Sequence, residues 1–140
     1  MREKTKVKVY YSLFGDDFDL DEVTRRIGIN PSSVSLKGER INENRTRKET
    51  SWTISTDYEE SLDVSGQLNQ IIIQLRDKCE IIKTIQKTFQ ATNKLFIVII
   101  IEEGMTPALY LDSEQIKFAN DINAEFDIDI YANPYNSEWD

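Results

Sequence analysis

Two aspartates near the end of the chain have the type and spacing of a carboxylate pair. Asp127 and Asp129 alternate with apolar residues in EFDIDIYA, so an extended strand would hold them on one face about 7 Å apart. Such a pair could bind a metal ion or flank a sugar as acid and base. The other interpretation is a solvated strand face, because charged side chains are rarely buried without a partner.

A second candidate lies in the long polar segment 32–50, the one basic patch of the chain. Gly38 stands between Lys37 and Arg40, and a glycine lets backbone amides approach a bound anion. The same residues are typical of a tight turn, which is the simpler explanation. The patch also contains Arg45, Arg47 and Lys48.

The stretch DFDLDEVTRRIGINP, residues 17–31, has the alternating aspartates of a calcium loop but lacks other required residues. A loop that starts at Asp17 needs a glycine at its sixth position and a glutamate at its twelfth. This chain has Glu22 and Gly28 there. The rules for a helix fit instead, because Asp19 and Glu22 are spaced as a capping box and Gly28 predicts the helix end.

The absence of histidine and the presence of one cysteine exclude several kinds of site. Histidine-dependent triads, histidine zinc sites and CxxC redox sites cannot be built from this chain, and it has no P-loop or GxGxxG motif. Cys79 lies on the apolar stripe of Leu75 and Ile82, so we expect a core residue and not a reactive thiol. We expect no cofactor and no metal.

Charge is unevenly distributed over the 140 residues, whose formal net charge is −8. The first fifty residues carry eleven Lys/Arg and nine Asp/Glu, whereas the remaining ninety carry six and sixteen. An acidic surface repels phosphate backbones and attracts basic proteins, so we expect a protein partner and no nucleic acid. No apolar run approaches the ~20 residues of a membrane span, and we expect a cytoplasmic protein that does not enter membranes.

Apolar residues repeat with period two in three segments, which predicts strands with one buried face. The predicted buried positions are Val7, Val9, Tyr11 and Leu13 in the first segment, Trp52, Ile54, Thr56 and Tyr58 in the second, and Phe126, Ile128 and Ile130 in the third. Residues 94–103 are apolar on both faces and predict a central strand covered on both sides. A short strand at 107–111 should pair with it as a hairpin.

Capping-box spacing marks two further helix starts. Asp112 and Gln115 begin a helix through 116–122, with an apolar stripe of Ile116, Ala119 and Ile122. Asp77 and Glu80 fall inside a longer helical pattern and favour a break there. The alternatives are one helix over 64–89 or two helices over 65–76 and 78–90.

These elements predict an α+β fold, a two-layer sandwich in ferredoxin-like style. We expect a mostly antiparallel or mixed sheet with helices mainly on one face, and a quasi-repeat of strand, capped helix and strand. Residues 1–140 should form one domain with a flexible tail from about 133. If helices cover one face of the sheet, Phe96, Val98 and Ile100 or their neighbours face the other way and need cover from further helices or a second subunit. Tyr135 and Trp139 either fold back or anchor a partner.

Several short motifs occur in an order that resembles a known family. They are Tyr11–Phe14, Asp21–Thr24, Gly28–Pro31, Lys37–Glu39 and Ser51–Trp52, then an apolar strand at 95–101, Pro-Ala-Leu and DIDIY. Over nearly the whole chain this order resembles the bacterial family catalogued as domain of unknown function number four-two-seven-nine. The family has no catalytic assignment to transfer. Its occurrence in bacterial toxin–immunity neighbourhoods implies a binding role.

Three functions remain open. The first is a non-enzymatic protein-binding module, such as an immunity-type inhibitor that neutralises a toxin through its acidic surface. The second is a small-ligand-binding protein or enzyme that uses Lys37, Arg40 and the strand carboxylates. The third is a homodimeric structural adaptor that assembles through its apolar sheet face. The candidate partner-binding residues are Lys37, Gly38, Arg40, Asp127, Asp129, Tyr135 and Trp139.

Overall fold

One mixed sheet forms a layer of the computed structural model, which describes residues 3–135. The strands are β1 (Lys6–Gly15), β2 (Ser33–Ser35), β5 (Thr50–Ser55), β7 (Thr92–Ile101) and β8 (Glu125–Ala132), with β6 (Glu59–Glu60) beside the start of β1. Their order across the sheet is β2-β5-β1-β7-β8. β1 runs antiparallel to β5 and β7, whereas β8 runs parallel to β7 because a helical crossover joins them.

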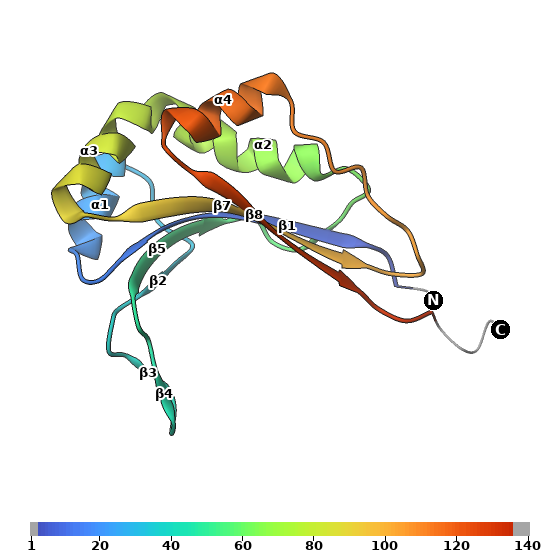
Figure 1. Cartoon of the computed structure of the whole chain (residues 1–140), viewed down its shortest axis with the longest axis horizontal. Helices are drawn as coiled ribbons and strands as arrows, with labels where there is room; N and C mark the ends of the chain where they lie inside the picture. Colours follow the sequence, from blue (N-terminus) through green and yellow to red (C-terminus); the bar gives the residue numbers. More distant parts are fainter. Residues whose placement is uncertain (1–2, 136–140) are drawn as a thin grey trace.

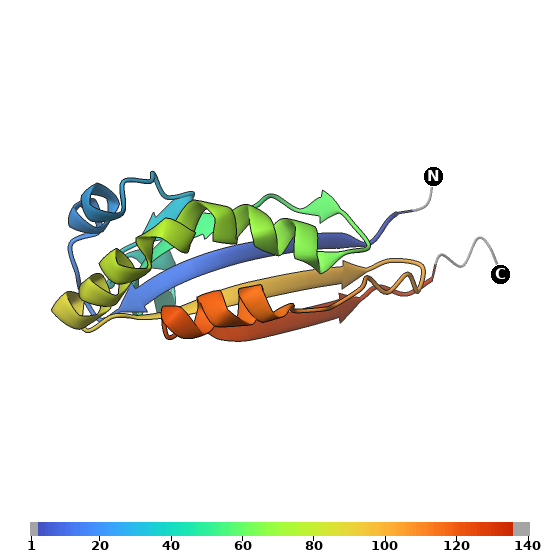
Figure 2. The ribbon, with the colours of Figure 1, turned by 90° about the horizontal axis from the view of Figure 1, so that it is seen from above.

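The helices form the second layer and cover one face of the sheet (Figures 1 and 2). They are α1 (Leu20–Ile27), α2 (Val64–Leu75), α3 (Cys79–Phe89) and α4 (Ser113–Asp121). This arrangement confirms the predicted α+β two-layer sandwich. No helix within residues 3–135 combines the length and apolar character that crossing a membrane requires.

The core lies between the two layers and follows the predicted alternation. The helix-side residues of the three long central strands are buried: Val7, Val9, Tyr11, Leu13, Trp52, Ile54, Leu95, Ile97 and Ile99. Each such side chain stabilises the fold by about 1.5–3 kcal/mol relative to exposure. A shift of one residue in strand pairing would expose the whole set, so burial fixes the register.

The helix starts follow the predicted capping residues to different extents. At α4 the box is complete, because Asp112 Oδ1 accepts from the Gln115 amide at 2.8 Å and Gln115 Oε1 from the Asp112 amide at 2.9 Å. At α1, Asp19 Oδ1 accepts from the Glu22 amide at 3.1 Å. The Glu22 carboxylate instead pairs with the two arginines of the next turn. Gly28 ends α1 at φ +77°, as predicted.

The long helical region divides into two helices near the predicted break. A 3₁₀ turn at Arg76–Lys78 (η1) separates α2 from α3, and Figure 1 shows the pair following the curve of the sheet. The predicted capping box at Asp77 is wrong, because α3 begins without a side-chain cap and Glu80 pairs with Lys83 at 2.9 Å.

The predicted hairpin between 107–111 and the central strand is also wrong. Both neighbours of β7 are already occupied by β1 and β8, so no edge remains for a further strand. Ala108 forms an isolated parallel bridge with Asp63. Its amide donates to the Leu62 carbonyl at 2.8 Å, and its carbonyl accepts from the Val64 amide at 3.1 Å. The segment thus contacts the start of α2.

Four residues expected on buried faces lie outside the core. Ile128 and Ile130 are 37% and 55% exposed, because β8 is an edge strand and α4 covers only its first part (Figure 2). Ile116 is exposed because α4 turns Gln115, Phe118 and Ala119 inward instead. Tyr58, expected on the buried face, lies beyond the end of β5 and is exposed.

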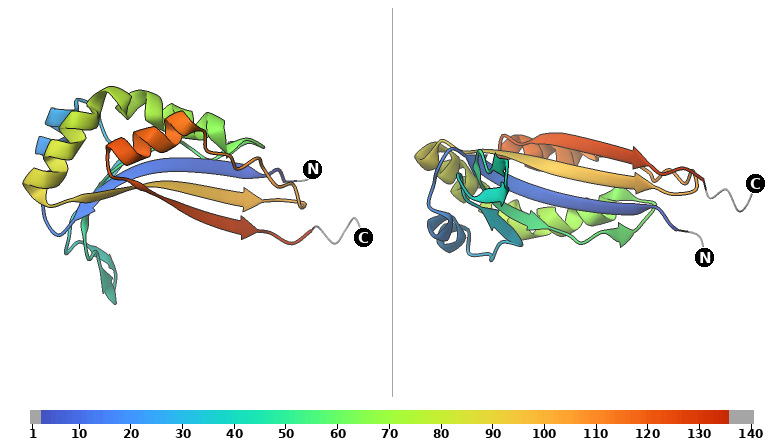
Figure 3. Two further views of the ribbon diagram at one scale, coloured as in Figure 1. Left: turned by 45° about the horizontal axis from the view of Figure 1, so that its top comes forward. Right: turned by 90° about the horizontal axis from the view of Figure 1, so that it is seen from below.

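The basic segment 32–50 is built from short strands. After β2 it forms the hairpin of β3 (Arg40–Asn42) and β4 (Arg45–Thr46). Figures 1 and 3 show this hairpin projecting from one end of the sheet, on the side away from the helices. The hairpin and the uncovered sheet face therefore meet at an angle.

Candidate binding groove on the open face of the sheet

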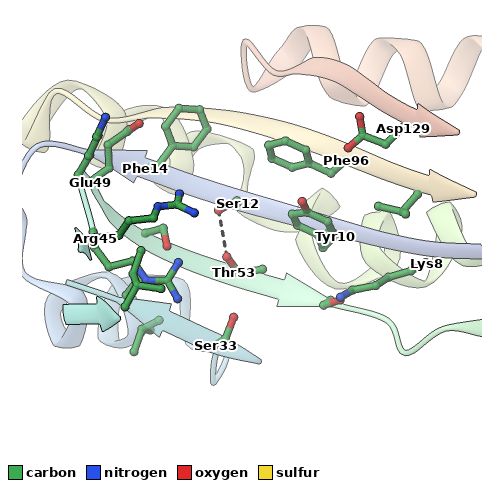
Figure 4. A pocket seen from close by; sticks show the side chains of 18 of the residues that line it. Lys8, Tyr10, Ser12, Phe14, Ser33, Arg45, Glu49, Thr53, Phe96 and Asp129 are labelled. Atoms are coloured by element: carbon green, nitrogen blue, oxygen red, sulfur yellow. Dashed lines mark hydrogen bonds between the residues drawn. The ribbon is translucent and has the colours of Figure 1, made fainter. Parts of the chain in front are cut away.

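The sheet face without helices is hollowed into a groove of about 1170 Å³, which we call the open-face groove. Its floor is formed by Lys8, Tyr10, Ser12, Phe14, Ser51, Thr53, Ser55, Phe96 and Val98. One side consists of β2 and the hairpin segment Ile41, Asn44, Arg45, Thr46, Arg47, Lys48 and Glu49, and the other margin is marked by Asp129 and Tyr131. Figure 4 shows most of the lining side chains and labels residues from β1, β2, β4, β5, β7 and β8 on this face.

Strand register explains which side chains meet on the floor. β1 pairs Tyr10 with Phe96 of β7 and Ser12 with Thr53 of β5, and residues directly opposite share one face. The Tyr10 and Phe96 rings therefore stack, with centroids 4.5 Å apart and planes 10° apart. The Ser12 and Thr53 hydroxyls form a 2.9 Å hydrogen bond (Figure 4).

A lysine lies over the aromatic rings of the floor. Lys8 Nζ is 5.5 Å from the centroid of the Tyr10 ring and 5.1 Å from that of Tyr58. A cation at this distance from an aromatic face is attracted by the ring quadrupole. Tyr58 thus extends the groove although it lies outside the sheet.

Turn conformations and local hydrogen bonds hold the hairpin beside the groove. Gly38 adopts φ +91°, which only glycine does readily, and its amide donates to the Arg47 carbonyl at 2.8 Å. At the tip, Asn42 Oδ1 accepts from the Asn44 amide at 2.9 Å, as in an Asx turn. Lys37 anchors the base through its amide, which donates to Thr50 Oγ1 at 3.1 Å.

Charges of opposite sign line the two sides of the groove. Arg45, Arg47 and Lys48 lie on the hairpin side beside a single carboxylate, Glu49, and Asp129 lies on the β8 margin. Figure 4 labels Arg45, Glu49 and Asp129. Asp127, on the same face of β8, has Oδ2 3.6 Å from Lys94 Nζ. The pKa of Tyr10 is raised above its ordinary value, first by partial burial and then by the negative charges of Asp129 and Asp127.

The groups in the groove offer several kinds of non-covalent contact. Hydroxyls, aromatic rings and guanidinium groups offer hydrogen bonds, stacking and charge-assisted contacts. The Ser12 and Thr53 hydroxyls are hydrogen-bonded to each other, and the Glu49 and Asp129 carboxylates accept hydrogen bonds. Within residues 3–135, no three His, Cys, Asp or Glu side chains form a group that could hold a metal ion.

The structure does not bring the sequence-predicted site residues together. Asp129 lines the open-face groove, but Lys37 and Arg40 do not. The Lys37 ammonium pairs with the Asp16 carboxylate, which raises the pKa of Lys37. Gly38 lies in a tight turn with φ +91°, which is the simpler of the two interpretations of the Lys37, Gly38 and Arg40 pattern. The open-face groove therefore does not combine Lys37 and Arg40 with Asp129.

The remaining single residues lie elsewhere. Tyr135 is exposed and packs beside Gly104, where an added Cβ would overlap its hydroxyl. Asn133, at the start of the expected tail, donates its amide to the Ile101 carbonyl at 2.9 Å. Trp139 lies outside the described residues. Cys79 is half-buried against the core, and burial is the main cause of its raised pKa.

Sequence reasoning missed the aromatic and hydroxyl floor of the groove. The sequence did indicate a second apolar sheet face, because residues 94–103 are apolar on both faces and the face away from the helices needed cover. Phe96 and Val98 are that second face, and Tyr10 supplies part of the cover by stacking. Cross-strand partners depend on register, which a strand pattern alone does not specify.

Comparison with known families matches residues 5–133 to the family described as "Domain of unknown function (DUF4279)". The resemblance noted from the ordered motifs is thereby confirmed, and the match spans the sheet, the helices and the hairpin. No curated protein and no solved structure matched the chain.

Proposed function

The chain belongs to the DUF4279 family, and we propose that it is a non-enzymatic protein-binding module that receives its partner in the open-face groove. The observation that carries this proposal is the convergence of Arg45 and Arg47 with the exposed rings of Tyr58 and Tyr131 over one concave face. The few residues that dominate binding energy at protein interfaces are enriched in arginine, tyrosine and tryptophan.

The dimensions of the groove support a polypeptide partner. Pockets for small molecules are typically about 300–1,000 Å³ and enclose most of the ligand. The open-face groove has about 1170 Å³ and lies along the uncovered sheet (Figure 4). A protruding loop or strand of another protein fits such a surface better than an enclosed metabolite does.

The charges support a partner with a predominantly basic surface and local acidic residues. The chain has a net charge of −8, and its basic hairpin is an exception on an acidic molecule. A basic protein would be attracted over long range, while acidic side chains of that protein would meet Arg45 and Arg47. An immunity-type inhibitor that neutralises a toxin in the cytoplasm is the specific function we propose within this class.

The test uses the protein encoded by the neighbouring gene as the binding probe. We expect binding whose association rate falls steeply between low and physiological salt, because steering charges are screened. Arg45→Glu should weaken binding by about tenfold or more, since a charge is reversed inside the interface. Arg40→Glu is the matched control, because Arg40 is exposed on the same hairpin but outside the groove.

Two results would contradict the proposal. One is the absence of binding to any neighbouring gene product. The other is an Arg40→Glu variant that loses binding while Arg45→Glu retains it, which would place the contact outside the groove. The small-ligand alternative stays a prediction, and a metabolite that raises the melting temperature through Lys37 and Arg40 would support it.

A further inference from the structure

Strand β8 has a free edge along its length. It is the last strand in the order β2-β5-β1-β7-β8 and pairs with β7 on its inner side. Nothing within residues 3–135 pairs with its outer side. Figure 3 shows β8 at the outer margin of the sheet in both views. Alternate residues of such a strand direct amide and carbonyl groups outward, where another strand can bind them.

The side chains of β8 divide into an acidic face and an apolar face. Asp127 and Asp129 lie on the side of the open face, opposite Phe96 and Val98 of β7. Ile128 and Ile130 stand opposite the buried helix-side residues Ile97 and Ile99, but they remain 37% and 55% exposed. Charged side chains on an edge strand discourage unwanted pairing with other chains, which explains Asp127 and Asp129. It does not explain Ile128 and Ile130, whose exposed apolar surface a partner would bury.

We propose that β8 accepts a strand from a partner protein in which basic and apolar residues alternate. Main-chain hydrogen bonds to the free edge provide the affinity, as in other cases of strand addition. The basic side chains of the incoming strand lie beside Asp127 and Asp129, and the apolar side chains cover Ile128 and Ile130. This surface is separate from the hairpin side of the groove and does not depend on it.

Charge argues against a second copy of this chain as the occupant. Two β8 strands related by a twofold axis pair antiparallel, and the register centred on Ile128 places Asp127 opposite Asp129 at two positions. Like charges directly opposite are destabilising. Lys94 stands opposite Glu125 and pairs with Asp127 at 3.6 Å, and the sole basic residue after Glu102 is Lys117. Two copies of β8 therefore repel each other in this register, whereas a strand with basic side chains is attracted to the edge.

The experiment titrates the full chain with a capped ten-residue peptide that alternates lysine and valine. N-methylation of every valine keeps the peptide from associating with itself and leaves one edge able to pair. We expect nuclear magnetic resonance shifts of β8 amides and slower exchange of those amides with solvent. The same peptide N-methylated at every residue keeps its charges but cannot donate hydrogen bonds, and it should not bind.

Substitutions test whether the peptide binds at the β8 edge or at another surface. The double variant Asp127→Asn/Asp129→Asn should weaken peptide binding by about tenfold, and Ile130→Lys should weaken it through repulsion. The charge-matched control is Asp21→Asn/Asp57→Asn, both exposed and away from β8. Arg45→Glu should leave peptide binding unchanged, so failure of the groove proposal and failure of this one are distinguishable.

Four results would overturn the inference. They are equal binding by the fully methylated peptide, no binding by the alternating peptide, full retention of binding in the Asp127→Asn/Asp129→Asn variant, and shifts confined to the helix layer. A stable dimer of the free protein with protected β8 amides would overturn it as well, because the second copy would then be the occupant.

Discussion

The Tyr10 ring stacks on the Phe96 ring with planes only 10° apart, on the sheet face that no helix covers. The pairing of β1 with β7 places the two residues directly opposite each other. Their stacking covers apolar surface that would otherwise face water and forms a flat floor for the open-face groove. The same contact places the Tyr10 hydroxyl within the field of the β8 carboxylates, which provides a measurable probe.

Replacement of Asp129 by Asn should lower the pKa of Tyr10. Burial is the first cause of the raised pKa and would persist, but the charge of Asp129 disfavours the phenolate and would be lost. Carbon resonances of the Tyr10 ring, followed by nuclear magnetic resonance against pH, measure the change. The exposed control Asp21→Asn should leave the pKa of Tyr10 unaltered, and an unaltered value in Asp129→Asn would disprove the electrostatic link.

The raised pKa of Tyr10 also predicts how stability varies in alkali. The folded state keeps the Tyr10 proton to higher pH than the unfolded state, whose tyrosine pKa is about 10. The stabilisation is therefore complete below about pH 10 and is lost as the pH rises through the folded pKa. Urea unfolding of the wild type and Tyr10→Phe across this range should show a steeper loss in the wild type.

Tyr11→Phe should destabilise the fold by about 1–2 kcal/mol, because the change removes a buried hydrogen-bond partner. Asn93 Nδ2 donates to Tyr11 Oη at 2.9 Å and to the Ile122 carbonyl at 3.3 Å. This network joins β1, β7 and the end of α4 inside the core. Tyr110→Phe is the control, because Tyr110 is 65% exposed. Equal free energies of unfolding for the two variants would show that the network contributes nothing.

Asp112→Ala and Asp77→Ala should differ in stability although both positions have capping-box spacing. Asp112 forms a complete box at α4, and its loss should cost about 1 kcal/mol. Asp77 lies within η1 and caps nothing, so its loss should change stability by less than about 0.5 kcal/mol. Chemical denaturation of both variants decides this, and a larger loss for Asp77→Ala would refute the assignment of η1.

Local sequence rules predicted the layers of this fold well for physical reasons. The alternation at Val7, Val9, Tyr11 and Leu13 and the cap at Asp112 depend on neighbours in the chain, and both were confirmed. The break between α2 and α3 was located near residue 77, although its cause was a 3₁₀ turn and not a side-chain cap.

The errors concern contacts that neighbours in sequence do not determine. The segment 107–111 had strand character, but β7 had no free edge to accept it. Ile128 and Ile130 had the alternation of buried residues, but β8 is an edge strand beyond most of α4. The open-face groove could not be predicted, because it depends on the register that places Tyr10 by Phe96 and on the direction of the hairpin.

Hydroxyl-radical footprinting of the complex with the neighbouring gene product tests the central claim most directly, because it reports the solvent exposure of individual aromatic rings. Tyr58 and Tyr131 line the groove and are 46% and 56% exposed, whereas Tyr110 lies outside it at 65%. We predict that binding protects Tyr58 and Tyr131 and leaves Tyr110 reactive. Protection of Tyr110 with unchanged oxidation of Tyr58 and Tyr131 would contradict the assignment of the open face as the recognition surface.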